Sequence, residues 1–552
     1  MTTIHLATTG NDATGDASLT RAIILARAAE SGRRRIIVAD GTYPNTSAIL
    51  ETADSALEIV AAKEAHPAFY AGIEVAGWRI EGGESPFWVI DLPGVRDGTW
   101  DFRALVVNGR LAMRARFPET GGIRHDSDFP VRWMSTTKGG WERQPTEAEL
   151  TTLRVRPESL PETMSERNAE LTIYHSWDES LVGIRKWDRD QGVITLSSPA
   201  GHPPGAFGSW KEQARTFVVW NVREGMTRPG QWFLDRDAGQ VVYWPLPEER
   251  LVDTIAYAPT VTTALRLAGT ETAPVQNVLL RGLSFGITNT PLLAGGFGAL
   301  RFEGAIEGSY AHGLRLDKIT VRWSGGQGIR INQSNGVRCS NSTVHDVGAG
   351  GMIFSGADGV VSDTLIRHNG RIYPSALALR VAGERWHVHH NTLHHTPYSA
   401  VNAGGSRLRF EHNRFHHVME ELVDGAAIYI FAAKNCVLRS NYTYDVRDEQ
   451  VHAYYLDEQS ADSLVIGNVA TDVAWPIHNH MAWNSVLRDN VCLNNGALRV
   501  SFHNCDRFRL ERNVFACQGE FVFEQSYTGV SLLRRNACFS QAGQYRWAFH
   551  DR

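Results

Sequence analysis

Short runs of alternating apolar and polar residues recur through the second half of the chain. Each run follows a small polar residue, as in LRLDKITV at Asp317, RCSNSTVHD at Asn341 and FEHNRFHH at Asn413. From Asp317 onward this position returns at intervals of about 22–28 residues, a length typical of solenoid repeats. A local period of two indicates strands, whereas a solenoid of helix pairs would show a period of 3.6 and a longer repeat. The recurrent positions are Gly282, Asp317, Asn341, Asp363, Asn391, Asn413, Asn441, Asn468, Asn490, Asn513 and Asn536.

A repeat of this length holds two or three short strands and as many turns, which predicts one coil of a right-handed parallel β-helix. Asparagine suits the recurrent position because it tolerates left-handed backbone angles and its amide can bond to the same side chain in the next coil. We therefore expect a structural asparagine ladder. Cys339, Cys492 and Cys538 each lie two residues from a recurrent position. They are expected to be buried thiols in such a column, since no CxxC pair indicates a metal site.

The N-terminal half of the chain is less regular. Asp16 and Ser18 can cap an amphipathic helix over LTRAIILARAAE, with Leu19 and Ile23 on its apolar face. We expect this helix to cover the open end of the solenoid, whose strand edges need protection. Segments such as RALVVNGRLAMRARF and QWFLDRDAGQVVYWPL resemble strands around hairpin turns and break the repeat. The predicted organisation is a cap with the first coils over 1–100, an inserted β-rich subdomain over 101–260 and the main β-helix over 261–552.

Composition narrows the class of protein. Of the 552 residues, 43% are hydrophobic and 21% are charged, which is typical of soluble globular proteins. The net charge of −5 gives no basic surface for nucleic acid. No apolar run approaches the roughly 20 residues of a membrane helix. The start MTTIHLATTG lacks a charged segment followed by an apolar run, so we expect a cytoplasmic protein, although a trimmed secreted chain would look the same. Oligomeric state stays open.

Longer segments resemble a known group of enzymes. LATTGNDATGD, followed by the helix and IIVADGTY, resembles the opening of many carbohydrate-active β-helix proteins. RALVVNGRLAMRARFP and WFLDRDAGQVVYWP resemble the inserted β region of glycoside hydrolase family 141, and VDGAAIYI, AYYLDEQS and PIHNHMAWNSVLRDNV resemble its successive coils. The resemblance spans nearly the whole chain and implies action on plant cell-wall glycans, including xylan and fucose-containing pectin. Ala426 replaces a usual glycine, and Glu458 replaces the second aspartate of a YLDD form.

Glycoside hydrolysis normally needs two carboxyl groups that flank the scissile bond. Asp424 and Asp457 are the candidate pair. Asp424 could also be an ordinary turn aspartate, because it precedes glycine. The family resemblance favours a catalytic role for it. If Leu456 points inward, Asp457 and Tyr455 point outward by strand alternation. Glu458 is a third catalytic candidate, expected to point away or to lie at the strand's end.

Candidate substrate-binding residues surround this pair. The interval between Asp457 and its ladder asparagine recurs in other coils, which places Asp457 in one column with Arg380, Asn402 and Asn479. Aromatic rings can stack on the apolar faces of sugars. The resemblance places a substrate-binding histidine near His478, and Glu421 lies on a loop that could reach the groove. The predicted binding set is His478, Tyr429, Tyr455, Trp475, Arg380, Asn402 and Glu421.

The histidines of WHVHHNTLHH and FEHNRFHH lie beside the ladder, where imidazoles can stack from coil to coil. His390 and His412 occupy equivalent places, which favours stacking over metal binding. We expect no metal and no cofactor, with Ca²⁺ disfavoured but open.

Two other functions fit the same fold. A polysaccharide lyase or uronate epimerase needs a basic residue to remove a proton and a cation to neutralise the substrate carboxylate. Between Asn413 and Asp472 the only lysine is Lys434, and the centre of this interval is acidic. A non-catalytic carbohydrate-binding solenoid is the third alternative, since a fold alone implies no activity. The predicted partner in every case is an oligosaccharide or polysaccharide.

Overall fold

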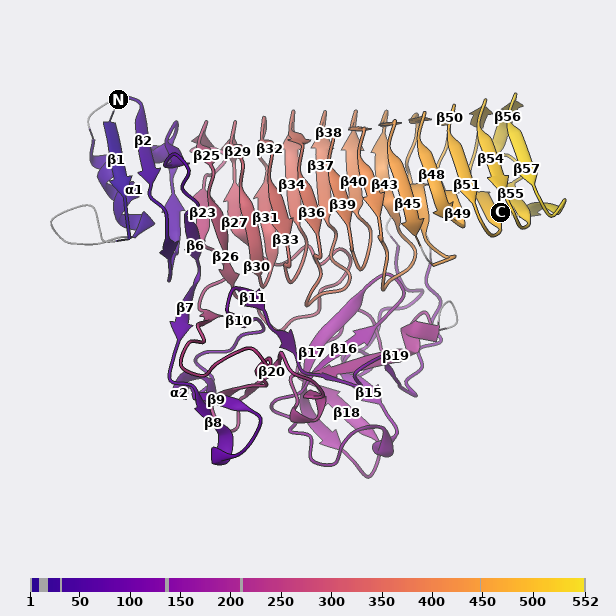
Figure 1. The fold of residues 1–552 in the computed structure, drawn as a ribbon. Coiled ribbons are helices and arrows are strands. Elements are labelled where there is room, and N and C mark those ends of the chain that lie inside the picture. The colour runs from indigo at the N-terminus through magenta and orange to yellow at the C-terminus, as the bar shows by residue number, and fades with distance from the viewer. Residues whose placement is uncertain are drawn as a thin grey trace.

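The computed structural model shows a long parallel β-helix with a second β-rich body along one side (Figure 1). The structure describes residues 2–8, 18–29, 32–134, 139–208, 212–446 and 448–550. Strands alone build the solenoid, as the period of two predicts. None of the helices in these ranges is long and apolar enough to cross a membrane.

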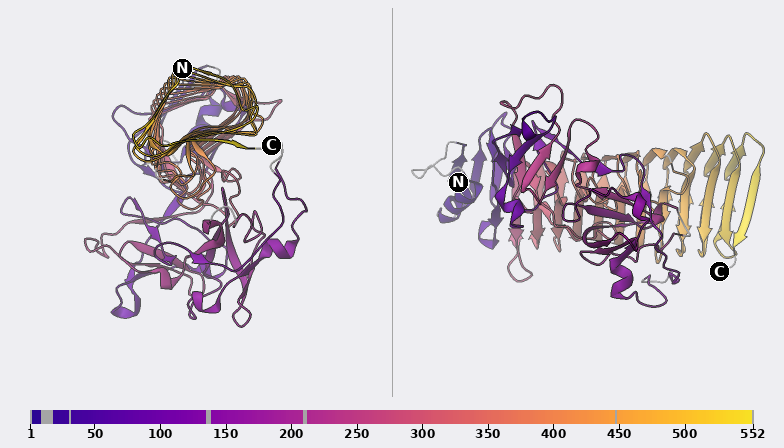
Figure 2. Two further views of the ribbon diagram at one scale, coloured as in Figure 1. Left: turned by 90° about the vertical axis from the view of Figure 1, so that its right-hand side faces the viewer. Right: turned by 90° about the horizontal axis from the view of Figure 1, so that it is seen from below.

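Each coil contributes one strand to each of three parallel sheets. One coil consists of β37 (Leu379–Glu384), β38 (His387–His389) and β39 (Thr392–His394), and the next begins at β40 (Val401–Ser406). Sheet 1 contains β38 and has 14 strands, while sheet 2, with β39, and sheet 3, with β37, have 13 each. The end-on view shows the coils superimposed as a single ring (Figure 2).

Aliphatic side chains fill the interior in columns, one residue per coil. In sheet 1 the column runs Leu316, Cys339, Val361 and Val388, each fully buried. The Cys339 thiol therefore replaces an aliphatic side chain, as predicted. Cys492 is in register with Ala470 and Phe515, which places it in the equivalent column of sheet 2.

The predicted asparagine ladder is present from Asn391 to Asn536. The Nδ2 of Asn441 donates to Oδ1 of Asn468 at 2.9 Å, and Asn413 donates to Asn441 at 3.0 Å. The predicted backbone angles are wrong for these members, because the residue before each asparagine has the positive φ, such as His390 at 56°. In the earlier coils the recurrent residue precedes the ladder position, by one residue at Asn341 and by two at Asp317. Asn341 itself has φ 51°, and Ser342 takes the ladder position.

Helix α1 (Leu19–Ala28) lies at the N-terminal end of the solenoid (Figure 1). Its buried residues include Leu19 and Ile23, which pack into the main core. The Ser18 hydroxyl accepts a hydrogen bond from the Arg21 backbone N–H and so caps the helix. Asp16, the other predicted cap, lies outside the described residues.

The body beside the solenoid is built from mostly antiparallel sheets of its own (Figure 2). One has the order β12 (Met113–Arg114), β20 (Gln231–Asp235), β21 (Gln240–Tyr243), β9 (Trp88–Asp91) and β8 (Arg79–Ile80). Another includes β19 (Thr216–Trp220), β16 (Glu170–Tyr174) and β17 (Glu179–Asp188). Separate apolar cores stabilise these sheets. We call this body the insertion, because the solenoid strands resume after it at β23 (Leu265–Ala268).

Candidate active site

Sheet 3 carries the candidate residues on neighbouring strands. Its register aligns Arg380, Asn402, Tyr429, Tyr455 and His478 in one column, on β37, β40, β43 (Ala426–Lys434), β46 (His452–Leu456) and β49 (Trp475–His480). Five of the predicted binding residues therefore form one stripe across the coils.

Asp457 is not in this column, so the prediction that aligned it with Arg380, Asn402 and Asn479 is wrong. It follows the last residue of β46, two positions beyond Tyr455. Asn479 is instead in register with Leu456 and is buried. The count from the ladder fails because the number of residues between sheet 3 and the ladder varies from coil to coil, and the pairing of β40 with β43 shifts register.

The Asp457 carboxylate is held by two side chains from the adjacent coils. Tyr429 donates its Oη–H to Oδ2 at 2.6 Å, and His480 Nδ1 lies 3.0 Å from Oδ1. The carboxylate is 9% exposed. Burial lowers the pKa of His480, but the hydrogen bond and charge of Asp457 outweigh it and raise that pKa overall. Asp457 is thus held between side chains of the coils before and after its own.

Asp424 lies in the turn just before β43, with φ 59°, as expected for a turn aspartate. Its Oδ1 lies 3.4 Å from the Tyr455 hydroxyl, and its carbonyl oxygen accepts from the Tyr398 hydroxyl at 2.9 Å. Burial, followed by the negative charge of Asp457, raises the pKa of Asp424 to about 6. The two candidate carboxylates thus interact from neighbouring coils but have different environments.

Glu458 lies in the turn after β46, at the strand's end. Burial, and then the charge of Asp457, raise its pKa to about 7. Its carboxyl therefore belongs to the same electrostatic cluster. Asp424, Glu458 and His480 are all partly exposed, so solvent reaches this cluster.

Three residues of the stripe have aromatic rings that pack against one another. The rings of Tyr429 and Tyr455 stack at 4.9 Å, and His478 lies 4.5 Å from Tyr455. His478 Nδ1 is 2.6 Å from the Ser501 hydroxyl, and burial lowers its pKa well below the usual range. Trp475 is covered on one face, because the Arg499 guanidinium lies 3.6 Å from its ring centroid. Trp475 therefore offers less free ring surface than a sugar platform would need.

Arg380 and Asn402 bond to each other rather than to either candidate acid. The Arg380 guanidinium donates to Asn402 Oδ1, and burial lowers the pKa of Arg380. The Asn402 amide nitrogen is buried and has no partner in the described part of the chain. The Asn402 amide can therefore donate a further hydrogen bond.

Glu421 borders a different space. Its Oε2 accepts from the Tyr174 hydroxyl at 3.3 Å, and burial raises its pKa. It lines a cavity of about 850 Å³ between the insertion and the solenoid, together with Trp220, His395 and Glu420. The Glu421 side chain thus opens into this cavity while its backbone leads to the Asp424 turn.

The insertion contributes polar residues that the sequence analysis missed. Asp178 and Glu179 lie at the start of β17, and Glu179 Oε2 accepts from the Ser375 N–H of a solenoid loop at 2.7 Å. Burial raises the pKa of Glu179 to about 8. Burial raises the pKa of Tyr398, and the charges of Asp424, Asp178 and Asp457 add to that effect, so Asp178 shares the electrostatic surroundings of the candidate pair.

Asp178 is part of a buried cluster with incomplete hydrogen bonding. His202 Nε2 lies 3.3 Å from Asp178 Oδ2. Asp178 Oδ1, His175 Nδ1 and His202 Nδ1 are buried and have no partner within the described ranges. The ring of His202 is surrounded by Phe207 at 5.1 Å, Trp133 at 5.5 Å, Trp141 at 5.7 Å and Trp177 at 6.1 Å. No repeat marks these residues, and only the HSWDES segment, with acids beside an aromatic residue, could have indicated them.

Comparisons with known proteins agree with this architecture. Residues 304–454 match the model of the right-handed β-helix region, and residues 85–246 match the model of the GH141 insertion domain. A solved structure described as a glycoside hydrolase is 19% identical, with a TM-score of 0.74, and the match covers 89% of this chain and 96% of that one. The chain is therefore a right-handed β-helix protein whose insertion is similar to the GH141 insertion domain.

Other solved structures are more distant. A complex of XylC with xylose is 10% identical, with a TM-score of 0.48, and the match covers 98% of this chain and 86% of that one. An exopolygalacturonase of family 28 from Yersinia enterocolitica is 11% identical, with a TM-score of 0.39, and the match covers 99% and 78%. No curated protein matches the sequence.

Proposed function

We propose that the chain is a glycoside hydrolase in which Asp424 and Asp457 are the catalytic carboxyl groups. The observation that carries this proposal is the placement of two interacting carboxyl groups by adjacent coils, one of which, Asp424, has its pKa raised to about 6 by burial and by the charge of the other. Glycoside hydrolysis uses two such carboxyl groups in different roles.

The environments suggest which group has which role. Asp457 accepts from Tyr429 and lies against His480, and these two contacts fix the position of its carboxyl group. It is our candidate for nucleophile or general base. Asp424, with a pKa of about 6, retains a proton in weakly acidic solution and is our candidate for the general acid. Glu458, with a pKa of about 7, is the alternative acid.

The binding surface in this proposal has two walls. The stripe of Asn402, Tyr429, Tyr455 and His478 forms the wall on the solenoid, and all four of its side chains are buried beneath the surface. The cluster of Asp178 and His202 forms the wall on the insertion, where buried polar atoms without partners match the hydroxyl groups of a sugar. The resemblance to family 141 points to plant cell-wall glycans as the substrate class.

The experiment is a screen of aryl xylosides, fucosides and arabinofuranosides with wild type, Asp424→Asn and Asp457→Asn. We expect hydrolysis by wild type of at least one substrate and losses of at least 100-fold in kcat/KM for both variants, because each carboxyl supplies a separate step. Melting temperatures no lower than that of wild type would show that the variants are folded. Full activity in both variants would refute the site.

The same assay separates hydrolysis from elimination. A lyase produces an unsaturated uronate that absorbs in the ultraviolet, whereas a hydrolase produces a new reducing end without that absorbance. A calcium-dependent absorbance rise on pectin or alginate, in place of glycoside hydrolysis, would replace this proposal with the lyase alternative.

A further inference from the structure

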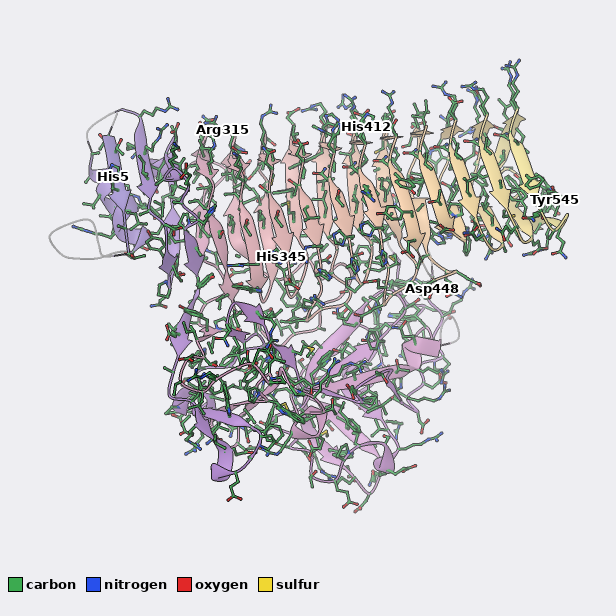
Figure 3. The ribbon with its side chains drawn as sticks, viewed as in Figure 1. His5, Arg315, His345, His412, Asp448 and Tyr545 are labelled. Carbon is green, nitrogen blue, oxygen red and sulfur yellow. The ribbon has the colours of Figure 1, made fainter. Side chains whose placement is uncertain are left out.

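Two neighbouring coils present consecutive histidines at the same turn of sheet 2. His394 ends β39 and His416 ends β42 (Arg414–His416), and the two residues are in register. His395 and His417 follow them with φ of 51° and 50°, so both coils turn in the same way. Figure 3 labels His345, the residue two coils earlier in this column, on the side of the solenoid that faces the insertion.

The four imidazoles form a two-by-two array. Within each coil the Nδ1 atoms lie close together, at 2.6 Å for His394 and His395 and 3.0 Å for His416 and His417. Between coils the rings stack, at 4.5 Å for His394 on His416 and 4.7 Å for His395 on His417. Stacking of coil on coil is the behaviour predicted for these histidines, but it also concentrates nitrogen lone pairs in one place.

Three of these histidines satisfy a geometric condition for metal binding. One ring nitrogen from each of His394, His395 and His416 lies within 4.8 Å of the other two. Zinc–nitrogen bonds of about 2.0–2.1 Å place the ligands of a tetrahedral ion roughly 3.3 Å apart, so modest side-chain rotations would close the site. Asp445 Oδ2 lies 3.0 Å from His417 Nε2 and orients the fourth imidazole, as carboxylates do beside metal-binding histidines.

The imidazoles of His394, His395 and His416 are half-buried, so an ion bound between them would be partly shielded from solvent. Arg367, one coil earlier, directs Nη1 to His368 Nδ1 at 2.8 Å, and Asp445 supplies negative charge on the other side. Imidazole nitrogen is a good ligand for Zn²⁺, Cu²⁺ and Ni²⁺, whereas Ca²⁺ and Mg²⁺ prefer oxygen.

We propose that His394, His395 and His416 bind one divalent transition-metal ion across the coils of β39 and β42. The bound ion would join two coils that are otherwise connected by backbone hydrogen bonds and core packing. Because His395 also lines the cavity of about 850 Å³, the ion would lie at the edge of the space between solenoid and insertion. This site is separate from the candidate carboxylates and does not depend on the proposed hydrolase activity.

The test is calorimetric titration of the full chain, without an affinity tag and after treatment with chelator, using ZnCl₂. We expect one ion per chain, and binding at least 10-fold weaker in His394→Gln and in His416→Gln. Zinc should also raise the melting temperature of wild type, because it binds only the folded array. Co²⁺ provides a second measurement, since its visible spectrum reports imidazole coordination directly.

The chain offers a matched control in the same coil. His389 and His390 also have Nδ1 atoms 2.9 Å apart, but the next coil presents Glu411 and His412 instead of a second histidine pair. His412 lies on the opposite edge of the solenoid (Figure 3). His389→Gln should therefore bind zinc like wild type. Absence of binding by wild type, or equal weakening in His389→Gln and His394→Gln, would overturn the proposal, provided that melting temperatures in chelator show all variants folded.

Discussion

The phenol of Tyr429 donates to the Asp457 carboxylate at 2.6 Å, across the boundary between β43 and β46. The two residues come from different coils and different columns, so the contact depends on how the coils stack. This short hydrogen bond fixes the orientation of the buried carboxylate. Tyr429 is therefore a positioning residue for the proposed nucleophile or base.

Replacing Tyr429 with phenylalanine should remove this bond while keeping the stacked ring. A hydrogen bond to a charged group contributes about 1.5–3 kcal/mol, so we expect kcat/KM to fall by about 10- to 100-fold. The loss should fall mainly on kcat with little change in KM, because the bond orients a group that acts in the chemical step. Tyr442→Phe, an exposed tyrosine on β45 (Tyr442–Val446), is the matched control and should leave both quantities unchanged. An unchanged kcat in Tyr429→Phe would contradict this role.

Asp424 should reduce stability at neutral pH. Its pKa in the folded protein is about 6, compared with 3.8 for an ordinary aspartate, so ionisation is disfavoured in the native state. This cost is present in full above pH 6 and disappears as the pH falls below 4. By linkage it amounts to about 2–3 kcal/mol in the free energy of unfolding.

Asp424→Asn cannot ionise and should therefore unfold at a higher temperature than wild type at pH 8, with the difference vanishing near pH 4. Thermal denaturation across this range is the measurement. Asp190→Asn, which makes the same charge change at an exposed position of the insertion, should show no such pH-dependent difference. A melting temperature of Asp424→Asn below that of wild type at pH 8 would show that ionisation of Asp424 does not reduce stability.

The repeated sequence pattern was sufficient to predict the β-helix fold. It was not sufficient to predict which outward-facing residues of successive coils lie in register. The ladder and the aliphatic columns repeat because each coil must fill the same interior, and a single sequence records that requirement. In the outward-facing column, Arg380 has the shortest separation in sequence from the ladder asparagine of its own coil. This separation is one residue longer at Tyr429 and two residues longer at Tyr455. Turns that vary in length change this interval without disturbing the core, so the residues that face Asp457 could not be found by counting.

The site residues of the insertion could not be predicted from the sequence for a different reason. Asp178 and His202 belong to loops of the insertion, and Asp178 lies near Tyr398, which bonds to Asp424, only because the insertion docks on the solenoid loops. Glu179 secures that docking through the Ser375 N–H. Nothing in the local sequence encodes a contact between segments so far apart in the chain. The family resemblance indicated the insertion but none of these side chains.

The asparagines of the ladder should stabilise the solenoid more where they are more deeply buried. Asn441 is buried, and its side chain donates to Asn468 and to the Phe410 carbonyl while accepting from Asn413. Asn441→Ala leaves these groups unpaired, which should lower the free energy of unfolding by about 2–4 kcal/mol in denaturant titrations. Asn536→Ala, at the last and less buried rung, should lower it by less than about half of that amount. Equal losses at both positions would contradict a role for burial.

The cluster of the insertion should influence substrate binding more than the chemical step. Asp178 Oδ1 and His202 Nδ1 are buried without partners in the described residues, and sugar hydroxyl groups can complete their hydrogen bonds. His202→Ala should therefore raise KM for an oligosaccharide by about 10-fold or more, with a smaller change in kcat, because an interaction made equally in ground and transition states affects KM. An aryl monosaccharide that occupies only the solenoid wall should show a smaller increase in KM. Asp237→Asn, an exposed acid of the insertion, is the control and should behave like wild type. An unchanged KM for every substrate in His202→Ala would remove the insertion from the binding surface and leave its unpaired atoms to ordered water.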